Sequence, residues 1–230
     1  MRTVYLHVLC EGQTELRFAS KVLATYLVVK GIIVLPQLLI TNRKKNVRGG
    51  ILSYKQAKRD LTFMISGAEN SEQDVHYFTS MFDLYALPDD FPGYAEATTL
   101  KDYSKVAKLE VAFRQDVNCN KFIPYIQLHE FEALVLCDID GLKDSYPNAA
   151  KQLADLKDEV TAQYGSNMEL VDNSRETAPS KRIIKALKDE YHYDKPKTGT
   201  EITDKIGIDV LRSKCQHFNE WLTNIENTCK

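Results

Sequence analysis

The 230 residues, of which 43% are hydrophobic and 27% charged, suffice for one large α/β domain with a buried core and exclude a wholly disordered chain. The 30 basic and 32 acidic residues leave a net charge of −2, so any binding of nucleic acid has to come from a local basic patch. The apolar runs are too short to cross a bilayer, and Glu11 interrupts the N-terminal apolar stretch that a signal peptide would need. The five cysteines are scattered and form no CxxC pair. Together these features indicate a cytoplasmic protein with reduced thiols.

Short apolar strands alternate with amphipathic helices through residues 1–140. Gly12 and Glu15 open the first helix, and a polar and basic loop covers residues 42–50. Pro124 indicates an edge or strand-start position in the last strand. The predicted strands are residues 3–9, 32–40, 75–82 and 122–128, and the predicted helices of this half include residues 16–27, 54–65 and 103–114. This alternation predicts an α/β fold with a mostly parallel sheet and helices on both faces.

Beyond Gly141 the pattern becomes mainly helical. We predict helices over 148–164, 180–191 and 208–225, separated by polar loops, one of them around Pro196 and Gly199. Residues 141–230 are therefore expected to form a helical appendage packed on a core of residues 1–140, the two making one compact unit. The large side chains at helical core spacing are Tyr26, Phe63, Phe218 and Trp221.

Carboxylates follow three of the predicted strands: Glu11, Asp83, and the pair Glu130 and Glu132. Ligands of open parallel sheets bind beyond the carboxyl ends of the strands, so these side chains are expected at one rim. Oxygen ligands of this kind suit Mg²⁺ or Mn²⁺. The alternative is that Glu11 and Asp83 are ordinary turn and helix-cap residues.

The conformation of the segment His129-Glu130-Phe131-Glu132 decides which of its side chains can act together. In an extended chain Glu130 and Glu132 share a face, whereas on a helix the compatible pair is His129 with Glu132. The spacing is not that of an HExxH zinc site. His129 is either a catalytic residue or an imidazole that orients such a residue or caps a helix.

Phosphate binding has three candidate sites, because amide groups and cations at a helix start attract anions. They are the turn at Gly12, the loop with Arg43, Lys44, Lys45 and Arg48, and the helix start with Lys181 and Arg182. The alternative for the loop is a solvated charge run. The chain has no GxxxxGK[ST] phosphate loop, no strand-linked GxGxxG and no serine-hydrolase elbow, so neither an ATPase, a dinucleotide oxidoreductase nor a serine hydrolase is indicated.

Five segments, in this order, resemble a known family: VLCEGQTE, MFDLYALPDDFPG, YIQLHEFEALVL, APSKRI and KCQHFNEWL. They are similar to the domain-of-unknown-function 4276 family, a TOPRIM-like family that includes RloG-type proteins of bacteria and archaea. The resemblance implies a TOPRIM-like fold, in which a strand-end glutamate and an Asp-x-Asp motif hold Mg²⁺ for phosphoryl transfer. Glu11 matches the glutamate and Asp83 the first aspartate, whereas Tyr85 replaces the second, so that Glu130 and Glu132 would complete the metal site.

The resemblance implies a Mg²⁺- or Mn²⁺-dependent nuclease or phosphodiesterase that acts on DNA or RNA. Its catalytic residues would be Glu11, Asp83, His129, Glu130 and Glu132, with Lys181 and Arg182 neutralising charge on the phosphate. The family setting also implies an ABC or OLD-like ATPase partner and a role in prokaryotic anti-phage defence. The alternative is a non-catalytic, degenerate TOPRIM module that binds nucleic acid or regulates a partner ATPase.

Overall fold

The computed structural model describes residues 2–42, 47–69, 74–171, 174, 177–187 and 192–229. Its main element is a five-stranded sheet in the order β2-β1-β5-β6, with the short β7 also paired to β5. The strands are β1 (Val4–Cys10), β2 (Ile32–Leu38), β5 (Val75–Asp83), β6 (Phe122–Ile123) and β7 (Ile126–Gln127). Every pairing in this sheet is parallel. The predicted fold class, α/β with a mostly parallel sheet flanked by helices and a helical C-terminal part, is confirmed.

The central strand β1 is in register with both neighbours over its whole length. Cys10 pairs with Leu38 of β2 and with Met81 of β5, so β1 and β5 end at the same rim. Leu6 and Val8 point to one face of the sheet and Leu9 to the other, and all three are fully buried. A strand covered on both faces is expected to be apolar almost throughout, as β1 is.

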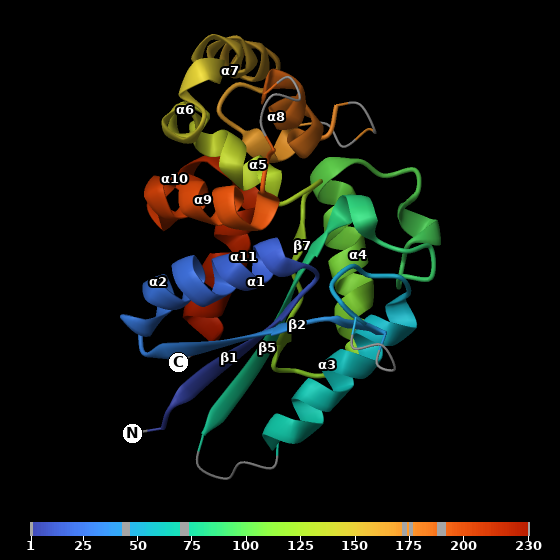
Figure 1. Cartoon of the computed structure of the whole chain (residues 1–230). Coiled ribbons are helices and arrows are strands. Elements are labelled where there is room, and N and C mark those ends of the chain that lie inside the picture. The colour runs from blue at the N-terminus through green and yellow to red at the C-terminus, as the bar shows by residue number, and fades with distance from the viewer. Residues whose placement is uncertain are drawn as a thin grey trace.

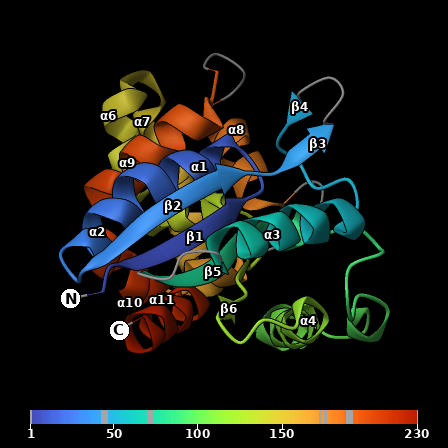
Figure 2. The same cartoon turned by 90° about the horizontal axis from the view of Figure 1, so that it is seen from below.

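Helices cover the two faces of the sheet unequally (Figures 1 and 2). On one face lie α3 (Tyr54–Glu69) and α4 (Asp102–Val117), which pack Leu61 and Leu109 against Phe78 and Phe82 of β5. On the other face α1 (Gln13–Phe18), the π-helical η1 (Ala19–Leu23) and α2 (Ala24–Val28) share a larger cluster with the C-terminal helices. Each face therefore has its own apolar core.

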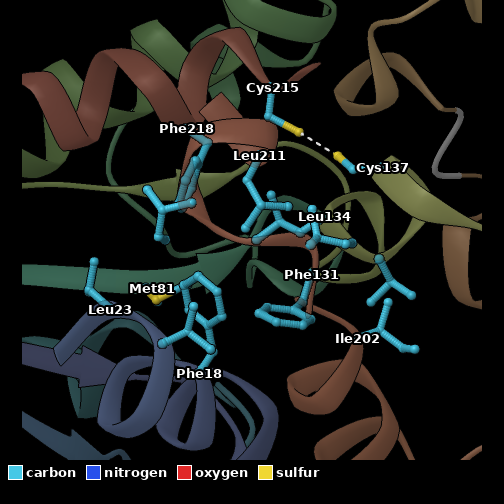
Figure 3. Packing of buried hydrophobic residues seen from close by; sticks show 14 of the residues in the cluster. Phe18, Leu23, Met81, Phe131, Leu134, Cys137, Ile202, Leu211, Cys215 and Phe218 are labelled. Atoms are coloured by element: carbon cyan, nitrogen blue, oxygen red, sulfur yellow. Dashed lines mark hydrogen bonds between the residues drawn. The ribbon is translucent and has the colours of Figure 1, made fainter. Parts of the chain in front are cut away.

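The C-terminal half is a chain of short helices, of which α6, α7 and α8 form a group at the top of Figure 1. Figure 3 shows Phe218 of α11 and Leu211 of α10 in one apolar cluster with Phe18, Phe131 and Met81. The elements are α5 (Glu132–Val135), η4 (Leu136–Asp138), α6 (Asp140–Ser145), η5 (Pro147–Ala149), α7 (Ala150–Tyr164), η6 (Met168–Leu170), α8 (Pro179–Leu187), η7 (Lys195–Gly199), α9 (Thr200–Ile206), α10 (Ile208–Lys214) and α11 (Gln216–Thr228).

The last helix, α11, is fixed at both its start and its middle by buried polar contacts. The carboxylate of Glu169, which is 0% exposed, accepts the backbone amides of His217 at 2.7 Å and Phe218 at 2.9 Å. The indole nitrogen of Trp221 donates to the hydroxyl of Thr79 on β5 at 2.9 Å, and its ring stacks on Tyr125 with centroids 4.2 Å apart. A carboxylate at a helix start is favoured by the helix dipole.

The prediction of one helix over 208–225 is wrong, because the chain breaks it at Cys215. Cys215 has an extended backbone (φ −129°, ψ 95°), and the amides that follow it bind Glu169 instead of continuing α10. The thiol of Cys215 lies 3.3 Å from that of Cys137, as Figure 3 shows.

Other local predictions also need correction. Residues 122–128 form two short strands separated at Pro124, and the edge position of β6 is confirmed. The predicted loop around Pro196 is the helical η7, in which Asp194 accepts the amide of Lys197. Part of the basic loop is a small hairpin, in which β3 (Ile40–Asn42) pairs antiparallel with β4 (Val47–Arg48). Phe63 is 58% exposed and does not belong to the core.

Helix 180–191 is observed as α8, which ends at Leu187, and residues 188–191 lie outside the described residues. Over the described ranges, no helix is both long and apolar enough to span a membrane.

Candidate functional site

Glu11 lies at the rim where β1 and β5 end together. Its backbone amide still donates to Met81 of β5 at 3.1 Å, and its side-chain oxygen accepts the amide of Asp83 at 3.0 Å. The carbonyl of Glu11 accepts the amide of Gly50 at 2.9 Å, which ties the turn after β4 to the same point. Glu11 is therefore held by two segments that are distant in sequence, β5 and the turn after β4.

Gly12 and Glu15 form the predicted start of α1. The amide of Gly12 donates to Oε2 of Glu15 at 2.8 Å, and a Cβ atom at Gly12 would lie 2.9 Å from that oxygen, so a larger residue would push the carboxylate aside. Phosphate binding at Gly12 stays a prediction. It would require Glu15 to move, because the amide of Gly12 already donates to the carboxylate of Glu15.

Asp83 is the last residue of β5. It makes no side-chain capping bond to the following helical turn η2 (Leu84–Ala86), and its Oδ1 is buried without a hydrogen-bond partner. Burial, followed by repulsion from four other carboxylates, raises its pKa well above the usual value. A buried carboxylate oxygen without a partner is costly in an ordinary structural role. The four neighbouring carboxylates are those of Glu15, Glu11, Glu132 and Glu130.

Glu130 and Glu132 complete this group from the loop and helix that follow β7. The carboxylate of Glu130 accepts the amide of Ser180, at the start of α8, at 3.0 Å. Glu132 is 2% exposed; one of its oxygens lies 3.4 Å from Nζ of Lys195 and the other is buried without a partner. Glu11, Glu15, Asp83, Glu130 and Glu132 are called the carboxylate cluster below.

Lys195, from η7, is the cation of this cluster. Burial opposes its charge, but Glu132, Glu130 and Asp83 outweigh this effect and raise its pKa above the usual value. One cation cannot neutralise five carboxylates, so the cluster favours protonation or the binding of a further cation.

Burial is the main cause of the raised pKa values in the carboxylate cluster. It raises the pKa of Glu11 to about 7, although the amide of Asp83 stabilises the charged form. Burial also raises the pKa of Glu15 to about 7, and repulsion from Glu11 adds to this effect. The pKa of Glu132 is raised to about 7 by burial, although the attraction of Lys195 acts in the opposite direction. At neutral pH each of these groups can therefore hold or release a proton.

Replacing Glu15 by glutamine is expected to stabilise the metal-free protein above neutral pH. Between the unfolded pKa of 4.5 and the folded value of about 7, the folded chain holds a proton that the unfolded chain has lost, so stability falls as pH rises through this interval. Glutamine keeps an acceptor for the amide of Gly12 and carries no charge. We expect a gain of roughly 2 kcal/mol at pH 8 and less than about 0.5 kcal/mol at pH 4.5, measured by urea unfolding in EDTA.

The matched control is Glu201→Gln, since Glu201 is an exposed carboxylate in the first turn of α9. The control should lack the difference between the two pH values. If both variants changed the free energy of unfolding equally at both pH values, the pKa of Glu15 could not be raised by burial and by repulsion from Glu11.

His129 lies in the loop between β7 and α5, so the helical pairing of His129 with Glu132 is not formed. Its backbone has φ 66°, in the left-handed region, and its Nε2 lies 3.8 Å from Asp102 at the start of α4. Its side chain lines a cavity next to α4. The side chain of His129 therefore lies beside α4 and not beside Glu132, whereas the neighbouring Glu130 belongs to the carboxylate cluster.

The three predicted phosphate sites are not equally described. Arg43, Lys44 and Lys45 lie outside the described residues, and of Arg48 only the backbone in β4 is described. Arg182 is 8% exposed, and its guanidinium donates to Glu159 at 2.6 Å and to the carbonyl of Thr177 at 2.8 Å. Lys181 is exposed. Because the amide of Ser180 is taken by Glu130, a phosphate at the start of α8 would have to displace that carboxylate.

The donors of the carboxylate cluster fit a hard divalent cation, because all are oxygens and two of the buried ones lack hydrogen-bond partners. Among the residues that the structure describes, no group of three or more His, Cys, Asp or Glu side chains is already arranged to hold a metal ion. Binding would therefore require the carboxylates to turn toward a common point, where the charge of the ion would offset their mutual repulsion.

Sequence reasoning missed two members of this site. The sequence indicates Glu15 only as a residue in the first turn of a helix. Its membership of the carboxylate cluster follows from its burial next to Glu11. Lys195 lies in a polar stretch without a motif, and the packing of η7 against α1 and α9 brings it to Glu132.

The fold and the site define a class: an α/β protein with a parallel sheet and a partly desolvated carboxylate cluster at the carboxyl ends of β1 and β5. The family described as a domain of unknown function (DUF4276) matches residues 10–226, so the chain belongs to that family, and the predicted membership of this family is confirmed. No curated protein and no solved structure matches the chain.

Proposed function

We propose that the protein is a Mg²⁺- or Mn²⁺-dependent phosphodiesterase that cleaves nucleic acid. The observation that carries this proposal is the carboxylate cluster, which Lys195 alone among the described residues balances, because a scaffold gains nothing from collecting repelling carboxylates at a strand rim. The same rim is where ligands bind in open parallel sheets.

Glu11, Asp83, Glu130 and Glu132 would hold the ion, which would polarise the phosphate and make a bound water more acidic. Glu11 would also be placed to accept a proton from that water. Lys195 would offset negative charge as it builds up on the phosphate, in the way that it now offsets Glu132. His129 and Lys181 remain candidates for substrate contacts outside this group.

A non-catalytic module is the second candidate. Two observations favour it: Tyr85, 44% exposed, occupies the position of the second aspartate of an Asp-x-Asp motif, and the described carboxylates are not yet arranged as metal ligands. Such a module would bind nucleic acid or regulate an ATPase. The family resemblance alone suggests the ATPase partner and a role in anti-phage defence, for either candidate.

The purified protein is expected to cleave nucleic acid only when Mg²⁺ or Mn²⁺ is present. Plasmid DNA and total tRNA, incubated in parallel with each metal or with EDTA, would identify the substrate class on a denaturing gel. Cleavage that persists in EDTA would contradict a metal-dependent mechanism.

Calorimetric titration with Mn²⁺ separates the two candidate functions when cleavage is absent. An enzyme that waits for a partner should still show saturable heat, and the heat should disappear in Glu11→Ala. A titration without saturable heat would favour the non-catalytic module.

A further inference from the structure

A cavity of about 360 Å³ lies at the start of α4, on the side of the sheet opposite α1. This volume is within the range of small-ligand pockets in proteins. Its polar and charged lining combines cationic side chains with a buried histidine and one aromatic hydroxyl. The lining residues that matter here are Lys101, Asp102, Lys105, His129 and Tyr164.

The two lysines give this cavity its charge. Among the described residues, neither Lys101 nor Lys105 has a carboxylate within ion-pair distance; Nζ of Lys105 lies 5.8 Å from the ring centre of Tyr94. Asp102, the acidic residue of the lining, faces His129 at 3.8 Å. Two lysines at one cavity, unpaired within the part of the chain that the structure describes, attract an anion.

The backbone of this cavity is held in an unusual conformation. Only three described residues other than glycine have positive φ, and two of them, Asp102 (φ 47°) and His129 (φ 66°), line the cavity. Such conformations persist where the surrounding structure fixes them, and they are concentrated at binding sites. The amide of Tyr85 donates to the carbonyl of His129 at 3.1 Å and holds this loop to the end of β5.

The cavity and the carboxylate cluster adjoin each other along two chain segments. Leu84, in the cavity lining, follows Asp83, and His129 precedes Glu130. Asp83 interacts with carboxylates on the α1 side, whereas Leu84 packs in the core below α3 and α4. A strand of nucleic acid bound at the cavity would therefore lie next to the two chain segments that carry Asp83 and Glu130.

We propose that this cavity binds a backbone phosphate of a nucleic-acid strand, flanking the phosphodiester that reaches the carboxylate cluster. The choice of a nucleic-acid strand as the ligand, and its position beside the carboxylate cluster, rest on the proposed function, whereas the binding of an anion rests on the cavity itself. Lys101 and Lys105 contact the phosphate, and the phenol of Tyr164 offers a surface for the adjoining sugar or base.

The test is the binding of a fluorescently labelled single-stranded oligonucleotide in metal-free buffer, measured by anisotropy over a range of salt concentrations. Lys101→Ala/Lys105→Ala is expected to weaken binding about 10-fold and to lower the salt slope by about 1. Lys108→Ala is the matched control, because Lys108 is an exposed lysine on the same helix outside the cavity lining. It should bind within about 2-fold of the unchanged protein.

A double variant that binds as well as the Lys108→Ala control, with circular dichroism unchanged, would overturn the proposal. A mononucleotide or inorganic phosphate that competes as strongly as unlabelled oligonucleotide would also overturn it, because the cavity would then be a site for a free ligand. Lysine-dependent binding without any metal-dependent cleavage would retain the cavity proposal and count against the nuclease alone. Cleavage that is unaffected in the double variant would count against the cavity alone.

Discussion

Glu11→Gln is expected to lower metal-dependent cleavage by about 100-fold or more. Replacing a residue that only supports a metal ligand costs 10- to 100-fold, so the loss of a ligand that also accepts a proton should cost at least as much. Glutamine keeps an acceptor for the amide of Asp83, which should leave the rim in place. Initial rates at saturating Mn²⁺ measure the effect.

Glu201→Gln is again the suitable control, since it removes one carboxylate from the exposed start of α9 and should leave the rate unchanged. Melting curves of both variants show whether the fold persists. A Glu11→Gln protein that is folded and still cleaves within about 3-fold of the normal rate would remove Glu11 from the mechanism.

Trp221→Ala is expected to destabilise the protein by about 3–5 kcal/mol, the usual cost of deleting a large buried aromatic side chain. Trp221 is 4% exposed, stacks on Tyr125 and donates to Thr79, so alanine would leave both a cavity and a buried hydroxyl without its donor. Urea unfolding followed by circular dichroism is the appropriate measurement, because Trp221 is the single tryptophan of the chain.

Trp221→Phe separates the two contributions. It keeps an aromatic ring near Tyr125 and removes the indole donor, so it should cost about 1–2 kcal/mol. If the alanine and phenylalanine variants were equally stable, the packing of an aromatic ring against Tyr125 would not be the main contribution of Trp221 to stability.

Local patterns made the sheet predictable. Apolar runs marked β1, β2 and β5, and the rule that parallel strands end at one rim was enough to bring Glu11 and Asp83 together before any coordinates were known. The helix-cap alternative for Asp83 was excluded only by the structure, because a strand-end aspartate in sequence does not reveal whether it bonds to the next turn.

Contacts between distant segments were not predictable from local patterns. The charge of Lys195 is useful to the cluster only because η7 packs against α1, and the end of α10 at Cys215 depends on Glu169, far away in sequence. The left-handed backbone of His129 turned that side chain toward α4, which no helical or extended spacing rule anticipates.

The position of α11 has a consequence for how the protein is made. Strands β1, β2 and β5 all precede Leu84, yet Leu6 and Val8 share a cluster with Phe218 and Leu222, which belong to α11. During synthesis this apolar face of the sheet stays incomplete until α11 has left the ribosome, well after the strands themselves. Until α11 emerges, this face of the nascent chain leaves apolar side chains uncovered, and such surfaces favour aggregation.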